Sequence, residues 1–126
     1  MTREQVTVYQ AVGGMAYFVG LVDRFYDAVE HDPSIRPLYP ADLTDARRHT
    51  ALFLAQYWGG PPIYNAERGH PRLRMRHQPF AIGQAERDAW LGHMLDAVRA
   101  APVQPEVESL LVDYFEHASE AMINQH

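Results

Sequence analysis

The chain contains no cysteine and no lysine, because all 11 of its basic residues are arginine. The lack of cysteine excludes a disulfide framework, a thiolate nucleophile, an iron–sulfur cluster and a cysteine-based zinc site. The lack of lysine excludes Schiff-base chemistry and the lysine-dependent phosphate loop. No catalytic triad or paired-carboxylate motif can be assembled from the remaining residues, so conventional hydrolase or kinase chemistry has no support.

Long apolar runs and an excess of positive charge are also absent. No run approaches the roughly 20 apolar residues of a membrane-spanning helix, and the first residues lack the plan of a signal peptide. Among 126 residues, 16 are acidic and 11 basic, which gives a net charge of −5 and argues against bulk binding to nucleic acid. We expect one cytoplasmic domain over residues 1–126, with no membrane span and no nucleic-acid partner.

Four stretches place apolar residues at helical spacing, and none alternates as a strand would, so the predicted fold class is all-α. The first helix follows Gly13 and Gly14, the second begins near the acceptable caps Thr44 or Asp45, and the last begins after Pro105. Their apolar stripes are Phe18, Leu21, Val22, Phe25 and Val29; Ala46, Thr50, Phe53, Leu54 and Tyr57; Trp90, Met94 and Val98; and Val107, Leu110, Leu111, Tyr114 and Phe115.

The stretch from Gly59 to Gly83 interrupts this order and is too long to be a simple turn. Within it, the residues from Arg72 to His77 predict one or two turns of helix with Leu73 and His77 on one face. His77 could be a surface histidine or a metal ligand. The other histidines show no zinc-type pairing with it, but a single axial histidine is enough for haem iron, since the macrocycle supplies the equatorial donors.

Four arginines of this stretch, Arg68, Arg72, Arg74 and Arg76, make a positive patch in an acidic chain. The patch could be a solvated loop face, a site for the two carboxylates of a haem, or the docking face of a haem-free helical interaction module.

Three aromatic residues with polar tips, Tyr26, Tyr39 and Trp90, lie near different apolar stripes. Ordinary core packing with satisfied hydroxyl and indole groups would explain them. If they converge on one cavity, they form a set of donors able to hold a polarised diatomic ligand. Sequence spacing does not decide between these readings.

Taken together, the residues from Tyr9 to Asn124 resemble the bacterial truncated haemoglobins, specifically their group II or O-type. The resemblance covers nearly the whole chain. The motifs that carry it are Arg24-Phe25-Tyr26, Tyr39-Pro40, Phe53 to Pro61 (FLAQYWGGP), Arg68 to His77 (RGHPRLRMRH) and Glu86 to Leu91 (ERDAWL).

The resemblance implies a truncated globin fold, a two-on-two helical sandwich around one non-covalent b-type haem. His77 matches the family's proximal iron ligand, and Tyr26, Tyr39 and Trp90 match its distal hydrogen-bond donors. Ala46 matches the distal gate, and Thr50 stands where close relatives commonly carry leucine, so the distal site is expected to be roomier and able to hold a water. The residues expected to contact the cofactor are His77, Arg76, Arg74, His49, Tyr39, Phe53, Leu54, Met75 and Trp90.

The function that the resemblance implies is reversible binding of O₂, and of CO and NO, with slow release and a carrier-type role. A redox alternative at the same haem, NO dioxygenation or a peroxidase-like reaction, would need an external reductase. The chain is expected to be a monomer or a homodimer.

Overall fold

The computed structural model describes residues 6–77 and 80–125 of the chain, apart from the side chains of Leu73 and Arg74. Within these ranges the regular structure is entirely helical, so the predicted all-α class is confirmed. The elements are α1 (Val8–Ala11), α2 (Met15–Glu30), the 3₁₀ turn η1 (Arg36–Leu38), α3 (Thr44–Tyr57), α4 (Ile63–Arg68), α5 (Leu73–His77), α6 (Gln84–Arg99) and α7 (Pro105–Ala121). Across these ranges, every helix is too short or too polar to cross a membrane.

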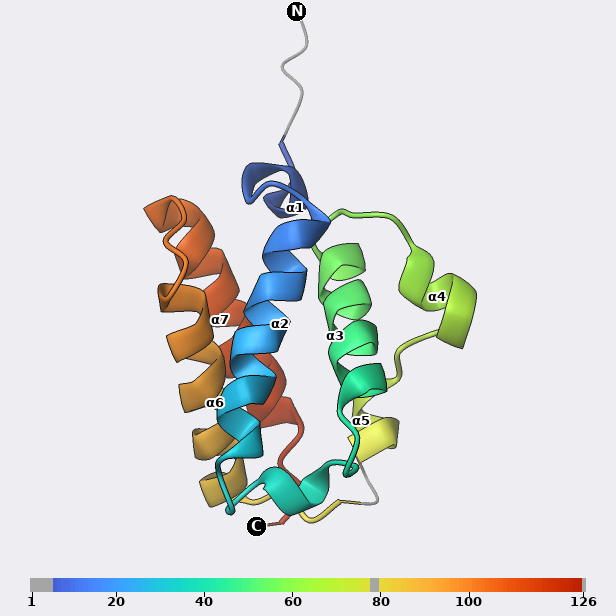
Figure 1. The fold of residues 1–126 in the computed structure, drawn as a ribbon, viewed down its shortest axis with the longest axis vertical. Coiled ribbons are helices and arrows are strands. Elements are labelled where there is room, and N and C mark those ends of the chain that lie inside the picture. The colour runs from blue at the N-terminus through green and yellow to red at the C-terminus, as the bar shows by residue number, and fades with distance from the viewer. Residues whose placement is uncertain (1–5, 78–79, 126) are drawn as a thin grey trace, which may run out of the picture.

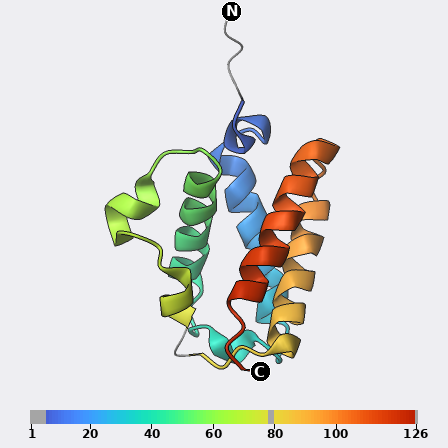
Figure 2. The same ribbon diagram turned by 180° about the vertical axis from the view of Figure 1, so that it is seen from behind.

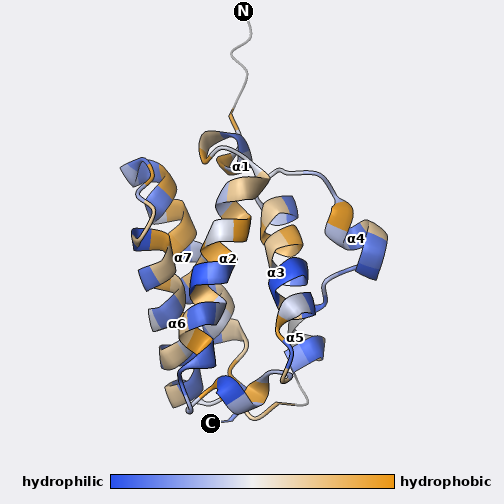
Figure 3. Ribbon diagram, in the orientation of Figure 1, coloured by the Kyte–Doolittle hydropathy of each residue, from blue (hydrophilic) through white to orange (hydrophobic). Residues whose placement is uncertain are grey.

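The four long helices form two antiparallel pairs, α2 with α3 and α6 with α7 (Figure 1). Helix α2 is central, because it packs against both α3 and α6, while α4 lies on the outer side of α3. Each long helix carries hydrophilic residues on one side and hydrophobic residues on another (Figure 3), as expected of amphipathic helices that share a core. The two-on-two arrangement is confirmed.

The stripe predicted for α2 is the centre of the core. Phe18, Leu21, Val22, Phe25 and Val29 are all at most 1% exposed. Full burial of one such side chain contributes about 1.5–3 kcal/mol relative to leaving it in water, so this stripe explains why α2 is held against both α3 and α6.

Two members of the other predicted stripes are exposed. Tyr57 on α3 is 54% exposed and Leu110 on α7 is 50% exposed. Tyr57 occupies the last position of α3, and its ring contacts that of Tyr114, with centroids 4.3 Å apart. Leu110 stands beside the buried Leu111, about 100° further round the helix, and so it faces outward.

The prediction for the start of α3 is confirmed in its position, but the predicted cap is wrong. The helix begins at Thr44 itself, with Leu43 at the cap position and no side-chain cap, and Asp42 accepts a hydrogen bond from the Thr44 N–H at 2.9 Å. The prediction for α7 is confirmed, because Pro105 is its first residue.

The long stretch from Gly59 to Gly83 contains two short helices, α4 and α5, of which only α5 was predicted from the sequence. Gly60 allows the chain to pass close to Ala55 and Tyr9 as it leaves α3. A Cβ atom at Gly60 would lie 2.7 Å from the Ala55 carbonyl oxygen and 2.7 Å from the ring of Tyr9. The first helix α1, which carries Tyr9, is tied to the end of α3 by a hydrogen bond from the Tyr9 N–H to the Trp58 carbonyl at 2.9 Å.

Candidate functional site

A cavity of about 480 Å³ lies between the helix pairs and is closed on one side by α4 and α5. Its volume falls within the usual range of small-molecule and cofactor sites. Most of the wall is apolar or aromatic, and it includes Phe25, Leu38, Phe53, Leu54, Met94 and Phe115.

The structure brings all but two of the residues expected at the site to the wall of this one cavity. They are Tyr26, Tyr39, Ala46, His49, Thr50, Phe53, Leu54, Arg76, His77 and Trp90. They come from α2, α3, α5, α6 and the corner after η1, so the convergence that sequence spacing left open is a property of the fold.

Met75 was expected at the cofactor, but it does not line the cavity and is 64% exposed. Successive residues of a helix are about 100° apart, so Met75 points about 200° away from His77, which faces the cavity. The predicted position of Met75 is therefore wrong. The side chain of Arg74, also expected at the cofactor, lies outside the part of the chain that the structure describes.

Tyr26 and Thr50 form a direct contact across the cavity wall. Their hydroxyl oxygens are 3.0 Å apart, and either can be the donor. Burial raises the pKa of Tyr26 above its usual value of 10, although the hydrogen bond with Thr50 and the charge of Arg47 act in the opposite direction. The Thr50 hydroxyl is thus a partner of Tyr26, and the roomier distal site able to hold a water stays a prediction.

Tyr39 and Trp90 complete this side of the cavity. The rings of Tyr26 and Tyr39 meet edge to face, with centroids 5.6 Å apart, and the ring of Trp90 lies 5.3 Å from that of Phe25. Burial, followed by the neighbouring Tyr26, raises the pKa of Tyr39, while a hydrogen bond with Trp90 opposes that shift. Both tyrosines are therefore protonated at neutral pH, so together with Trp90 they present hydroxyl and indole groups rather than charges to this part of the cavity.

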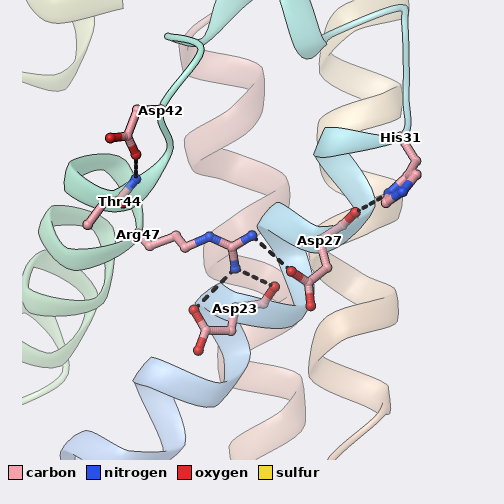
Figure 4. A network of polar contacts seen from close by, with 6 residues as sticks. All are labelled: Asp23, Asp27, His31, Asp42, Thr44 and Arg47. Carbon is pink, nitrogen blue, oxygen red and sulfur yellow. Dashed lines mark hydrogen bonds and ion pairs between the residues drawn. The ribbon is translucent and has the colours of Figure 1, made fainter.

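Arg47 on α3 forms ion pairs with two carboxylates of α2 (Figure 4). Arg47 donates from Nη2 to Asp27 Oδ1 at 2.8 Å, and from Nη1 to both the carbonyl oxygen and Oδ1 of Asp23 at 3.1 and 3.2 Å. Its guanidinium carbon also lies 5.9 Å from the centroid of the Tyr26 ring. These contacts fix the spacing of the two helices at the point where Tyr26 meets Thr50.

The α4–α5 side of the cavity carries positive charge. Arg68 Nη1 lies 3.0 Å from His49 Nδ1, and Arg76 donates to the Arg68 carbonyl at 3.3 Å and stacks over Tyr64. Among the described residues, the partners of these two guanidinium groups are an imidazole, a carbonyl and an aromatic ring, so no carboxylate of this set neutralises them.

Four polar residues that line the cavity were not predicted from the sequence to lie there: Asp45, Glu86, Arg87 and Ser119. Arg87 on α6 donates to the Ser119 hydroxyl and to the Glu116 carbonyl, both at 3.0 Å, and both Arg87 and Ser119 line the cavity. Isolated polar residues on helices that otherwise read as amphipathic give no sequence signal. The positive patch that contains Arg68 was recognised from the sequence, but Arg68 itself was not predicted to lie at the site.

Asp32 and His93 tie the turn after α2 to α6. His93 Nε2 lies 2.6 Å from Asp32 Oδ2, and Ser34 donates its N–H and O–H to Asp32 Oδ1. The bonds from Ser34, and then the bond from His93, lower the pKa of Asp32 from 3.8 to about 2. The turn leads into the corner that carries Tyr39, and His93 follows Trp90 by one turn of α6, so this pair connects the elements that hold both side chains.

We expect Asp32→Asn to destabilise the protein in a pH-dependent way. A carboxyl whose pKa is lower in the folded state contributes stability above the pKa of the unfolded chain, and loses it as the pH falls from about 4 towards 2. Urea unfolding should therefore show a deficit near neutral pH that shrinks across this window. Asp113→Asn, at an exposed carboxylate of α7, is the matched control, and a deficit that does not change with pH would contradict this account.

Among the described residues, the candidate metal ligands are single histidines and not clusters. No three His, Asp or Glu side chains come together as a candidate ion site within the described ranges. The chemistry of the donors fits a haem instead: one imidazole from α5, an apolar wall, and arginines that match carboxylates.

Comparisons with known proteins agree with this geometry. A model of the bacterial-like globin family matches residues 7–124. Group 2 truncated hemoglobin YjbI of Bacillus subtilis is 42% identical over 117 residues, which cover 93% of this chain and 88% of that protein.

Solved structures are similar as well. A hemoglobin from Chloroflexus aurantiacus superposes with a TM-score of 0.94 at 53% identity, covering 96% of this chain and all of that one. A truncated oxygen-avid haemoglobin from Bacillus subtilis gives 0.89 at 40% identity, covering 94% and 100%. The chain is a globin. Within the globins it belongs to the group II truncated haemoglobins, a family that implies a haem cofactor.

Proposed function

We propose that the cavity holds a non-covalent haem b with His77 as its axial ligand, and that the protein reversibly binds O₂, CO and NO there. The observation that carries this proposal is the convergence of Tyr26, Tyr39 and Trp90 on the cavity that His77 also lines. The name of the Bacillus subtilis relative, an oxygen-avid haemoglobin, supports O₂ as the ligand.

A bound haem would supply an iron able to take a diatomic ligand. The chain's own residues would do the rest. His77 would hold the iron from α5, and the apolar wall would exclude water. Arg68, Arg76 and His49 would receive the two propionates, because guanidinium groups pair strongly with carboxylates.

On the distal side, the protein would retain its ligand by hydrogen bonding. Bound O₂ would be polarised, and the hydroxyl and indole groups of Tyr26, Tyr39 and Trp90 would serve as neutral donors to it, Tyr26 in place of its contact with Thr50. Ala46 has too small a side chain to take part, so stabilisation has to come from these three residues. Retention of this kind favours ligand storage or sensing over bulk oxygen transport.

Haemin titration of the purified protein tests this function. We expect stoichiometric uptake with a Soret band, and a further shift of that band when CO is added to the reduced protein. A protein that acquires no Soret band would exclude the globin function and leave the haem-free interaction module. Steady-state NO consumption with an added reductase would identify the redox alternative.

A further inference from the structure

The residues after α7 lie against the residues that lead into α6, around Ile82 (Figure 2). The Asn124 and Gln125 backbone N–H groups both donate to the Ile82 carbonyl, at 2.8 and 3.0 Å. The end of the chain is thereby attached to the segment that follows His77.

The Asn124 side chain adds three contacts to this segment. Its Oδ1 accepts from the Ile82 N–H at 2.9 Å, and its Nδ2 donates to the Phe80 carbonyl at 2.7 Å and to the His77 carbonyl at 3.4 Å. A carboxamide has one accepting oxygen and a nitrogen with two protons, so both ends of the group are used. The amide orientation follows from the partners, because a backbone N–H faces the oxygen and two carbonyls face the nitrogen.

This attachment matters because α5 is short. A helix of five residues is not stable by itself. The principal helix contacts are α2–α3, α2–α6, α6–α7 and α3–α4, and α5 belongs to none of them, since the cavity separates it from the core. On the side that precedes His77, Arg76 donates to the Arg68 carbonyl. On the side that follows it, the Phe80 N–H donates to the His77 carbonyl at 3.0 Å, and Asn124 bonds to the carbonyls of both residues.

We propose that Asn124 is a positioning residue for His77. By holding the His77 and Phe80 carbonyls, its amide fixes the end of α5 and hence the direction from which the imidazole enters the cavity, together with the other contacts of His77. The inference rests on the proposed function, in which His77 is the axial ligand of a haem. It assigns a role in setting the iron–histidine bond to a residue 47 positions away from that ligand in the sequence.

Asn124→Asp and Asn124→Ala test this role in the haem-loaded full-length protein. Aspartate has nearly the shape of asparagine and can still accept from Ile82, but it turns an oxygen towards the two carbonyls. We expect resonance Raman spectra of the reduced, unliganded protein to show a shifted iron–histidine stretch in both variants, with haem uptake preserved. Asn65→Asp, the same substitution at an exposed position of α4, is the matched control and should keep the wild-type frequency.

Hydrogen exchange of the Ile82 amide gives a second readout, independent of ligand binding. Asn124→Ala should speed this exchange about 2- to 13-fold, the factor expected for one lost hydrogen bond, whereas Asn124→Asp should change it less. Faster exchange with an unshifted iron–histidine stretch would overturn the positioning role. If one variant fails to fold by circular dichroism, the other decides. Absence of haem uptake by the wild-type protein would instead be a failure of the proposed function.

Discussion

Replacing His77 with glycine is expected to abolish the histidine-ligated spectrum of the haem-loaded protein. Among the described residues that line the cavity, only His77 and His49 carry an imidazole, and His49 is engaged with Arg68. Without His77, the cofactor would be held only by packing and by contacts to its propionates. Added imidazole should restore the lost spectrum, because glycine leaves space for a free ligand in the cavity.

His49→Ala is the control that separates the two imidazoles. It should keep the iron–histidine stretch of the wild-type protein and lower haem affinity only modestly, through the loss of one polar contact at the arginine side. The assignment of the axial ligand would be wrong if the His77 variant kept the wild-type stretch and the His49 variant lost it.

The second large effect is expected in the release of O₂. Trp90→Phe and Tyr26→Phe should each accelerate dissociation about 2- to 13-fold, which corresponds to loss of one neutral hydrogen bond of about 0.5–1.5 kcal/mol. Thr50→Val should act in the opposite direction. The Thr50 hydroxyl lies 3.0 Å from that of Tyr26 and competes with a ligand for it, so its removal should slow dissociation.

Stopped-flow displacement of O₂ by CO measures these rates. Tyr57→Phe removes a tyrosine hydroxyl from an exposed side chain outside the cavity wall and should leave the rate unchanged. Unchanged dissociation in both the Trp90 and the Tyr26 variants would show that these donors do not hold the ligand. Acceleration by Thr50→Val would show that the threonine orients Tyr26 towards the ligand rather than away from it.

Much of the fold could be predicted from the sequence, because the patterns that specify each helix involve residues close together in the chain. Three features follow from the spacing or conformational preference of nearby residues: the buried stripe of α2, the first residue of α7 and the short helix that ends at His77. Helices α1 and α4 were missed, since four and six residues are too few to establish an apolar period.

The composition of the candidate site was also predictable, but its geometry was not. Tyr26, Tyr39 and Trp90 were recognised as polar-tipped aromatics, and only the packing of α2, the corner after η1 and α6 places them on one wall. Thr50 was noted for its hydroxyl, but its pairing with Tyr26 depends on the distance between α2 and α3, which Arg47 sets through two carboxylates of α2.

The residue pattern of the chain was enough to predict an all-helical globin, and the lack of cysteine excludes thioether attachment of the haem that the family implies. Tertiary structure decided which neighbours of His77 share its cavity. In the folded chain Met75 faces outward, and Arg68 and Arg87 lie on the cavity wall. Asn124, near the end of the chain, contacts the residues that follow His77. The physical reason is that apolar spacing fixes which side of a helix is buried, whereas a site depends on the distances between helices.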